Sequence, residues 1–176
     1  MHLDIVQTNP VDRIIRPKQQ KPRKEKIALT KEELNKFLTL AKKDARPVLY
    51  TAWHTLAYTG LKRGELLGLE WSDIDFKNKT ISVSKTLVTI NGKLSTQSPK
   101  TKRSARTISL DDSTIQILKE WKLEQKKLFF KFGVKPTNIV ITNTKGGYFD
   151  FAHFRDELKY FLGKHKLKQF SVHSLR

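Results

Sequence analysis

Apolar residues recur at helical spacing soon after residue 30. They follow an i, i+3, i+4, i+7 pattern at Leu34, Phe37, Leu38 and Ala41. The segment Thr30-Lys31-Glu32-Glu33 is a capping box that predicts the start of this helix. A second apolar run begins at Pro47, which suits a first helical turn, and stops at Gly60. A third helix is predicted to begin near Arg63 and to end before Trp71.

The pattern then changes to the alternation typical of strands. Residues 79–84 and 85–90 alternate and contain β-branched side chains, and Asn91-Gly92 is a strong hairpin signal. Residues 105–110 predict the next strand. We therefore expect a small antiparallel sheet inserted after the third helix.

The second half of the chain returns to helices. Asp111-Asp112-Ser113 predicts the cap of a long helix that ends near Phe130. Residues 138–142 predict a short strand and 145–147 a turn, and a last helix carries its apolar face from Phe151 to Leu162. The fold class predicted by this order is α+β, mainly helical.

The first 26 residues differ from the rest. Residues 1–8 predict one or two helical turns, which Asn9-Pro10 breaks. Residues 16–26 hold two prolines, many charges and almost nothing apolar, which predicts an extended linker. We expect residues 1–26 to be the end of a preceding domain and its basic linker, and residues 27–176 to form one domain.

The net charge of the chain indicates which kind of partner it binds. The formal net charge is +18, from 35 Lys and Arg against 17 Asp and Glu. An excess of this size predicts a polyanionic partner, with nucleic acid as the default, because the basic residues cluster in 16–31 and 93–106. The alternative is a lysine-rich surface that serves only solubility.

Other composition features exclude several classes of site. The chain has no cysteine, so disulfides and thiolate zinc sites are excluded, and a cytoplasmic protein is compatible with this. No apolar run approaches the roughly 18–20 residues that span a bilayer. The first residues lack the pattern of a signal peptide.

Three segments could carry chemistry. In residues 60–75, Lys62 and Arg63 begin the third predicted helix, where cations are unfavourable unless a phosphate shares the site. Residues 98–110 form a basic hairpin whose lysines could simply be solvated. His173 and Arg176, in the sequence His-Ser-Leu-Arg, would by themselves be ordinary surface residues.

In this order and spacing, the three segments closely resemble the catalytic domain of tyrosine recombinases, the phage integrase family. The resemblance runs from about Asn9 to the end. It implies that residues 1–26 end a core-binding domain, and that double-stranded DNA is broken and rejoined through a 3′-phosphotyrosine intermediate. It also implies no metal or cofactor, a homo-oligomer on DNA, no membrane, and a cytoplasmic protein of bacterial or phage origin.

The resemblance assigns roles to individual residues. The catalytic positions are Lys62, Lys100, His173 and Arg176. Lys100 would protonate the leaving 5′ oxygen, with Lys102 as the alternative, while His173 would move the proton of the nucleophile and Arg176 would hold the phosphate. The residues expected to contact backbone phosphates are Lys102, Arg103 and Arg106.

The first motif departs from the family. Lys62 occupies the position of the first catalytic arginine, and lysine offers one point charge where arginine offers a planar fork. Three explanations are open: an engineered change, a natural weak or inactive enzyme, or substitution by Arg63. We expect Glu65 to orient neighbours and balance charge.

The nucleophile of the family lies downstream of the His-x-x-Arg motif. The chain has four tyrosines, all before His173: Tyr50, Tyr58, Tyr148 and Tyr160. We therefore expect a catalytic domain truncated before its tyrosine and inactive by itself. One rival is a non-catalytic DNA-binding protein on the same fold, which Lys62 favours. A second is a basic RNA-binding protein, which the third motif and Lys100 disfavour.

Overall fold

A computed structural model describes residues 28–98 and 105–175. The helix and linker expected over residues 1–26 lie outside these ranges. The helices are α1 (Lys31–Asp44), α2 (Pro47–Thr59), α3 (Arg63–Leu67), α4 (Asp112–Lys131) and α5 (Phe151–Lys164), with 3-10 helices η2 (Trp71–Asp73) and η4 (Val172–Leu175). The strands are β1 (Ile74–Asp75), β2 (Thr80–Val83), β3 (Thr86–Ile90), β4 (Lys93–Gln97) and β5 (Arg106–Ser109).

The helix ends follow the capping signals. Thr30 Oγ1 accepts the Glu33 N–H at 3.2 Å, and Glu33 Oε2 accepts the Thr30 N–H at 2.9 Å, so the capping box forms as predicted. Gly60 ends α2 with φ of 62°, a left-handed conformation that glycine adopts without a steric penalty. Asp111 caps α4 by accepting the Thr114 N–H at 2.9 Å.

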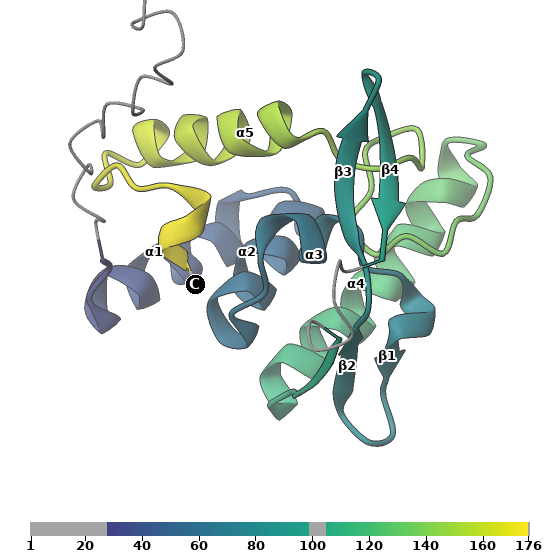
Figure 1. Cartoon of the computed structure of the whole chain (residues 1–176). Helices are drawn as coiled ribbons and strands as arrows, with labels where there is room; N and C mark the ends of the chain where they lie inside the picture. The colour runs from purple at the N-terminus through teal and green to yellow at the C-terminus, as the bar shows by residue number, and fades with distance from the viewer. Residues whose placement is uncertain (1–27, 99–104, 176) are drawn as a thin grey trace, which may run out of the picture.

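The strands form two antiparallel sheets, as Figure 1 shows. One has the order β1-β2-β5 and the other is the β3–β4 hairpin, which projects from the domain. Its Asn91-Gly92 turn has positive φ at both residues, 48° and 73°, and pairs Ile90 with Lys93. This confirms the hairpin signal and the antiparallel arrangement.

One hydrophobic core joins helices and sheets. At its centre, Trp53 of α2 lies 5.3 Å from Phe37 of α1 and 5.2 Å from Phe161 of α5, measured between ring centroids. Val172 and Leu175 of η4 are also buried in it. In the described residues, no helix is both long and apolar enough to cross a membrane.

The third helix begins at Arg63 and ends at Leu67, before Trp71, as predicted, and the Leu69 carbonyl beyond it accepts the Val140 N–H. The strand predicted over residues 138–142 was wrong. Residues 138–142 form no strand; they make only isolated bridges, Glu70 to Ile139 and Thr142 to Tyr148. The Gln125 side-chain amide donates hydrogen bonds to the backbone carbonyls of residues 139 and 140. It therefore competes with the backbone hydrogen bonds that a β-strand would form there.

Two glycines let α3 lie directly on β3. A Cβ added at Gly64 would come 2.5 Å from Thr86 Oγ1 and 3.0 Å from the Leu87 carbonyl. At Gly68, one turn later, it would come 2.9 Å from the Leu87 backbone nitrogen. The glycines therefore set the distance between α3 and the base of the hairpin.

We expect Gly68→Ala to lower the free energy of unfolding by about 1–3 kcal/mol, because a backbone atom has to move to admit the methyl group. Urea denaturation measures this. The matched control is Gly163→Ala in α5, where nothing lies within 4 Å and alanine should be neutral or slightly stabilising. Equal losses at the two positions would contradict the close-packing argument.

Candidate active site

The turn after α2 presents two cations. Gly60 and Leu61 lead into Lys62 and Arg63, and both basic side chains are exposed. The Arg63 guanidinium carbon lies 4.7 Å from the ring centroid of Phe151, at the start of α5, a cation–π contact. The ion pairs formed within the described residues do not include Lys62. Of the two cations, Lys62 is therefore the one without a side-chain partner in the described part of the chain.

Glu65 lies beneath this turn and is buried. Its Oε2 accepts the Lys62 backbone N–H at 2.7 Å, which fixes the start of α3. Burial would raise the pKa of Glu65, but hydrogen bonds from Arg106 and from the Lys62 N–H outweigh it and hold this pKa below its ordinary value. The carboxylate therefore stays charged at neutral pH.

Arg106 joins the second motif to the first. Its Nη1 donates to Glu65 Oε1 at 2.9 Å and its Nη2 to Glu65 Oε2 at 2.8 Å, a bidentate pair. We expected Arg106 to contact DNA phosphates, and the structure instead gives two of its nitrogens a partner inside the protein. Its side chain is still 36% exposed, so a phosphate contact through its free face stays a prediction.

A second ion-pair cluster holds the base of the hairpin. Lys85, between β2 and β3, lies 3.0 Å from Glu70 Oε2 and 2.9 Å from Asp73 Oδ2. Burial lowers the pKa of Lys85, but its hydrogen bonds to Asp73 and Glu70 raise it further than burial lowers it. The hairpin is thus fixed to η2 by charge and to α3 by the close contact of the two glycines.

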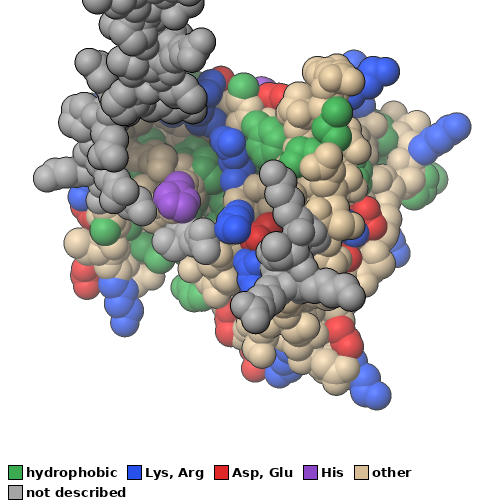
Figure 2. Space-filling view, viewed as in Figure 1, with side chains coloured by type: hydrophobic (Ala, Val, Ile, Leu, Met, Phe, Trp, Pro, Cys, Tyr) green, Lys and Arg blue, Asp and Glu red, His purple; other side chains and the backbone are tan. Residues whose placement is uncertain are grey.

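His173 lies on η4, which packs against α2. Its neighbours Val172 and Leu175 point into the core, and this leaves the His173 side chain exposed. Figure 1 places η4 and α3 toward the same side of the molecule, and Figure 2 shows Lys, Arg and His side chains on that face. Packing within the fold therefore connects the third motif to α2, the helix that leads into the first motif.

The structure describes part of the predicted site. Lys62, Arg63, Glu65, Arg106 and His173 lie in the described ranges, whereas Lys100, Lys102, Arg103 and Arg176 lie outside them. Glu65 and Arg106 are the predicted residues in direct side-chain contact.

The sequence did not predict three residues that hold the site in place by packing or charge: Gly64, Gly68 and Lys85. For the glycines, the available signal was their spacing of four residues, one within a short helix and one just after it. Nothing local signalled Lys85, because its partners lie 12 and 15 positions earlier in the chain.

The sequence is similar to those of known proteins of one family. A model of the phage integrase family matches residues 28–176. The chain is 31% identical to the ICEBs1 integrase of Bacillus subtilis (strain 168) over 178 residues, which cover 100% of this chain and 47% of that protein. It is 36% identical to a tyrosine recombinase XerC-like protein of Caldanaerobacter subterraneus over 132 residues, covering 67% of this chain and 34% of that protein.

The fold is similar to a solved structure of the Tn1549 transposon integrase in complex with a circular intermediate DNA. The TM-score is 0.77 at 24% identity, over 98% of this chain and 57% of that chain. The chain spans about half the length, or less, of the curated relatives described above. The chain belongs to the phage integrase family and has the fold of the tyrosine recombinase catalytic domain.

Proposed function

We propose that this chain is the catalytic domain of a site-specific DNA recombinase that acts through a 3′-phosphotyrosine intermediate. The observation that carries the proposal is the bidentate Glu65–Arg106 pair, at 2.8 and 2.9 Å. It ties the turn that presents Lys62 to the strand that follows the basic segment containing Lys100. Two motifs some 40 positions apart are thereby held together, as one phosphate-binding site requires.

In this proposal, each cation serves one reacting group. Lys62 and Arg176 stabilise charge on the non-bridging oxygens of the scissile phosphate, and Lys100 protonates the 5′ oxygen that leaves. His173 assists the transfer of the proton from the attacking tyrosine. Glu65 touches no DNA; it positions the Lys62 turn through the backbone N–H of that residue.

The proposal extends to organisation and partners. Residues 1–26 would belong to the end of a core-binding domain and its linker, and residues 27–176 to the catalytic domain. The partner is double-stranded DNA, on which the full recombinase assembles as a homo-oligomer. This is supported by the family match and by the net charge of +18.

The chain should bind duplex DNA weakly and with little sequence preference, because phosphate contacts give affinity without reading bases. The logarithm of the binding constant should fall with the logarithm of salt concentration, by about 0.9 for each phosphate neutralised. Fluorescence anisotropy with two unrelated duplexes measures both properties. Binding that does not respond to salt, or none at low salt, would exclude the DNA-binding role.

The same chain should form no covalent complex with DNA. Its four tyrosines all precede His173, and the family resemblance places the nucleophile after it. A suicide substrate analysed on a denaturing gel should show no protein–DNA band. A band that maps to Tyr148 or Tyr160 would show that the nucleophile has been placed wrongly.

A further inference from the structure

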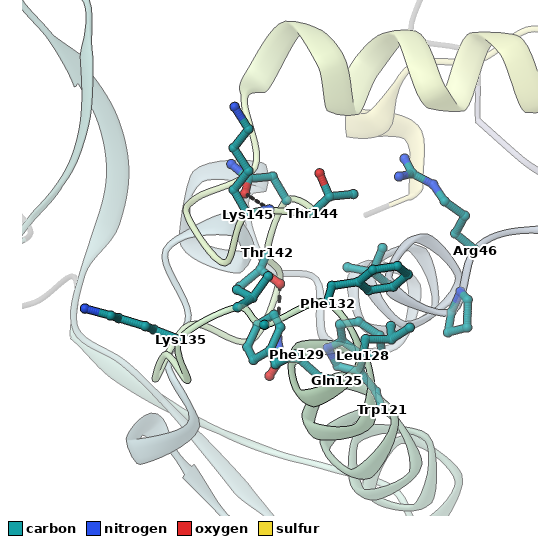
Figure 3. A pocket seen from close by; sticks show the side chains of 15 residues that line it. Arg46, Trp121, Gln125, Leu128, Phe129, Phe132, Lys135, Thr142, Thr144 and Lys145 are labelled. Carbon is teal, nitrogen blue, oxygen red and sulfur yellow. Dashed lines mark hydrogen bonds between the residues drawn. The ribbon is translucent and has the colours of Figure 1, made fainter.

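A concave surface lies at the C-terminal end of α4. A cavity of about 810 Å³ opens between the end of α4, the start of α2, and the loops at residues 132–135 and 142–145. Lys62 and His173, the proposed catalytic residues that the structure describes, do not line it. Figure 3 shows Leu128, Phe129 and Phe132 grouped within it, with Arg46 at one side and Lys135 and Lys145 toward the other.

The walls of the cavity are fixed by packing between its two loops. Gly146, with φ of 80°, comes so close to the other loop that an added Cβ would lie 2.9 Å from Val134 Cγ1. Trp121 donates from Nε1 to the Val140 carbonyl at 2.7 Å, and Gln125 bonds Thr142 Oγ1 at 3.2 Å. A surface held in this way is formed before any ligand arrives, which lowers the entropic cost of binding.

A large aromatic side chain is exposed at the cavity. Phe132, which lines it, is 66% exposed, although Phe129, which also lines it, is buried. Aromatic residues exposed around a hollow are typical of protein interaction surfaces, where they act as anchors.

The charge around the cavity is positive. Arg46 is already paired with Glu157. Lys135 and Lys145 are both exposed, and neither takes part in the ion pairs formed among the described residues. An occupant with carboxylates flanking apolar side chains would complement both the lysines and the apolar walls.

The same features argue against two other occupants. A DNA backbone would satisfy the lysines but would leave the phenylalanines without apolar partners. A second copy of the chain carries the same positive excess, and most carboxylates in its described part are already engaged; for example, Glu33 pairs with Lys168, Asp44 with Lys164, and Glu65 with Arg106. These features disfavour DNA and a second copy of the described residues, and they favour a segment of a different protein.

We propose that this cavity is a docking site for an acidic, amphipathic segment of a partner protein. The segment inserts leucine or phenylalanine side chains between α4 and the two loops, and places carboxylates near Lys135 and Lys145. This is the helix-in-groove mode, in which apolar anchors recur at i, i+3, i+4 and i+7. Lys62, Arg106 and His173 do not line this cavity, so we expect the partner and DNA to bind together.

The test uses a fluorescein-labelled peptide of about 12 residues, with Leu and Phe at the four anchor positions and Glu elsewhere. Fluorescence anisotropy with the 176-residue chain should show binding that weakens at least about tenfold in the double variant Lys135→Glu, Lys145→Glu. Phe132→Ser should also weaken it. A second peptide, with serine at the anchor positions and the same glutamates, should bind far less tightly than the first.

The matched control is Lys36→Glu, Lys77→Glu, which makes the same change in net charge at exposed lysines elsewhere and should alter affinity less than about twofold. Equal loss in the two double variants would overturn the proposal, because binding would then follow net charge alone. So would competition by duplex DNA, absence of binding at about 1 mM protein, or a dimer of the chain that Phe132→Ser dissociates. Circular dichroism confirms that each variant is folded.

Discussion

Lys62→Arg should raise the rate of DNA cleavage about 100-fold in a full-length recombinase that carries this domain and its tyrosine. A planar guanidinium can bond two phosphate oxygens where an ammonium offers a single point charge. Charge accumulates on those oxygens in the transition state, so the gain appears in the rate of the chemical step. DNA affinity should change little, because ground-state binding is spread over many phosphates. Single-turnover cleavage of a suicide substrate measures the rate.

The control for this prediction is Arg63→Ala in the lysine background. Arg63 lies over the Phe151 ring at 4.7 Å, and this contact directs its guanidinium toward the start of α5. We therefore expect Arg63→Ala to leave the cleavage rate within about threefold, as for a residue outside the chemical step. If Arg63→Ala abolishes cleavage while Lys62→Arg has no effect, Arg63 is the phosphate clamp. If neither change alters the rate, this turn does not hold the scissile phosphate.

The helices and the hairpin were predictable because their signals are local. Thr30 and Glu33 are three residues apart, and so are Asp111 and the Thr114 N–H that it caps. Asn91-Gly92 needs only positive φ at two adjacent residues. Each of these interactions closes within a single turn, so the sequence pattern and the structure contain the same information.

The support of the site was not predictable in this way. Glu65 and Arg106 are 41 positions apart, and nothing near either residue shows that they meet. Likewise, the strand expected at residues 138–142 had a suitable local pattern. Its carbonyls are instead bonded by Gln125, a side chain on another element. Interactions across the fold decided both outcomes, and they overrode local propensity.

Arg106→Ala should lower the free energy of unfolding by about 2–3 kcal/mol at pH 7. It leaves the Glu65 carboxylate, whose side chain is only 9% exposed, with the Lys62 N–H as its remaining hydrogen-bond donor among the described residues. Glu65→Gln should cost less, because Arg106 is 36% exposed and water can replace its lost partner. Urea denaturation at pH 7 measures both. Arg155→Ala, which breaks an exposed pair with Asp156, is the control and should leave the free energy of unfolding nearly unchanged.

The contribution of Glu65 to the pH dependence of stability should change sign between the native protein and Arg106→Ala. In the native protein the pKa of folded Glu65 is below its ordinary value of 4.5, so the unfolded chain takes up a proton first. The stability that Glu65 contributes is therefore complete above about pH 4.5 and is lost as the pH falls through the folded pKa. Without Arg106, burial becomes the main influence and raises the folded pKa, so acidification should recover part of the lost stability. The difference in unfolding free energy between the native protein and Arg106→Ala should thus shrink steadily from pH 7 toward pH 4. A difference that stays constant would show that Glu65 is not the group left unpaired.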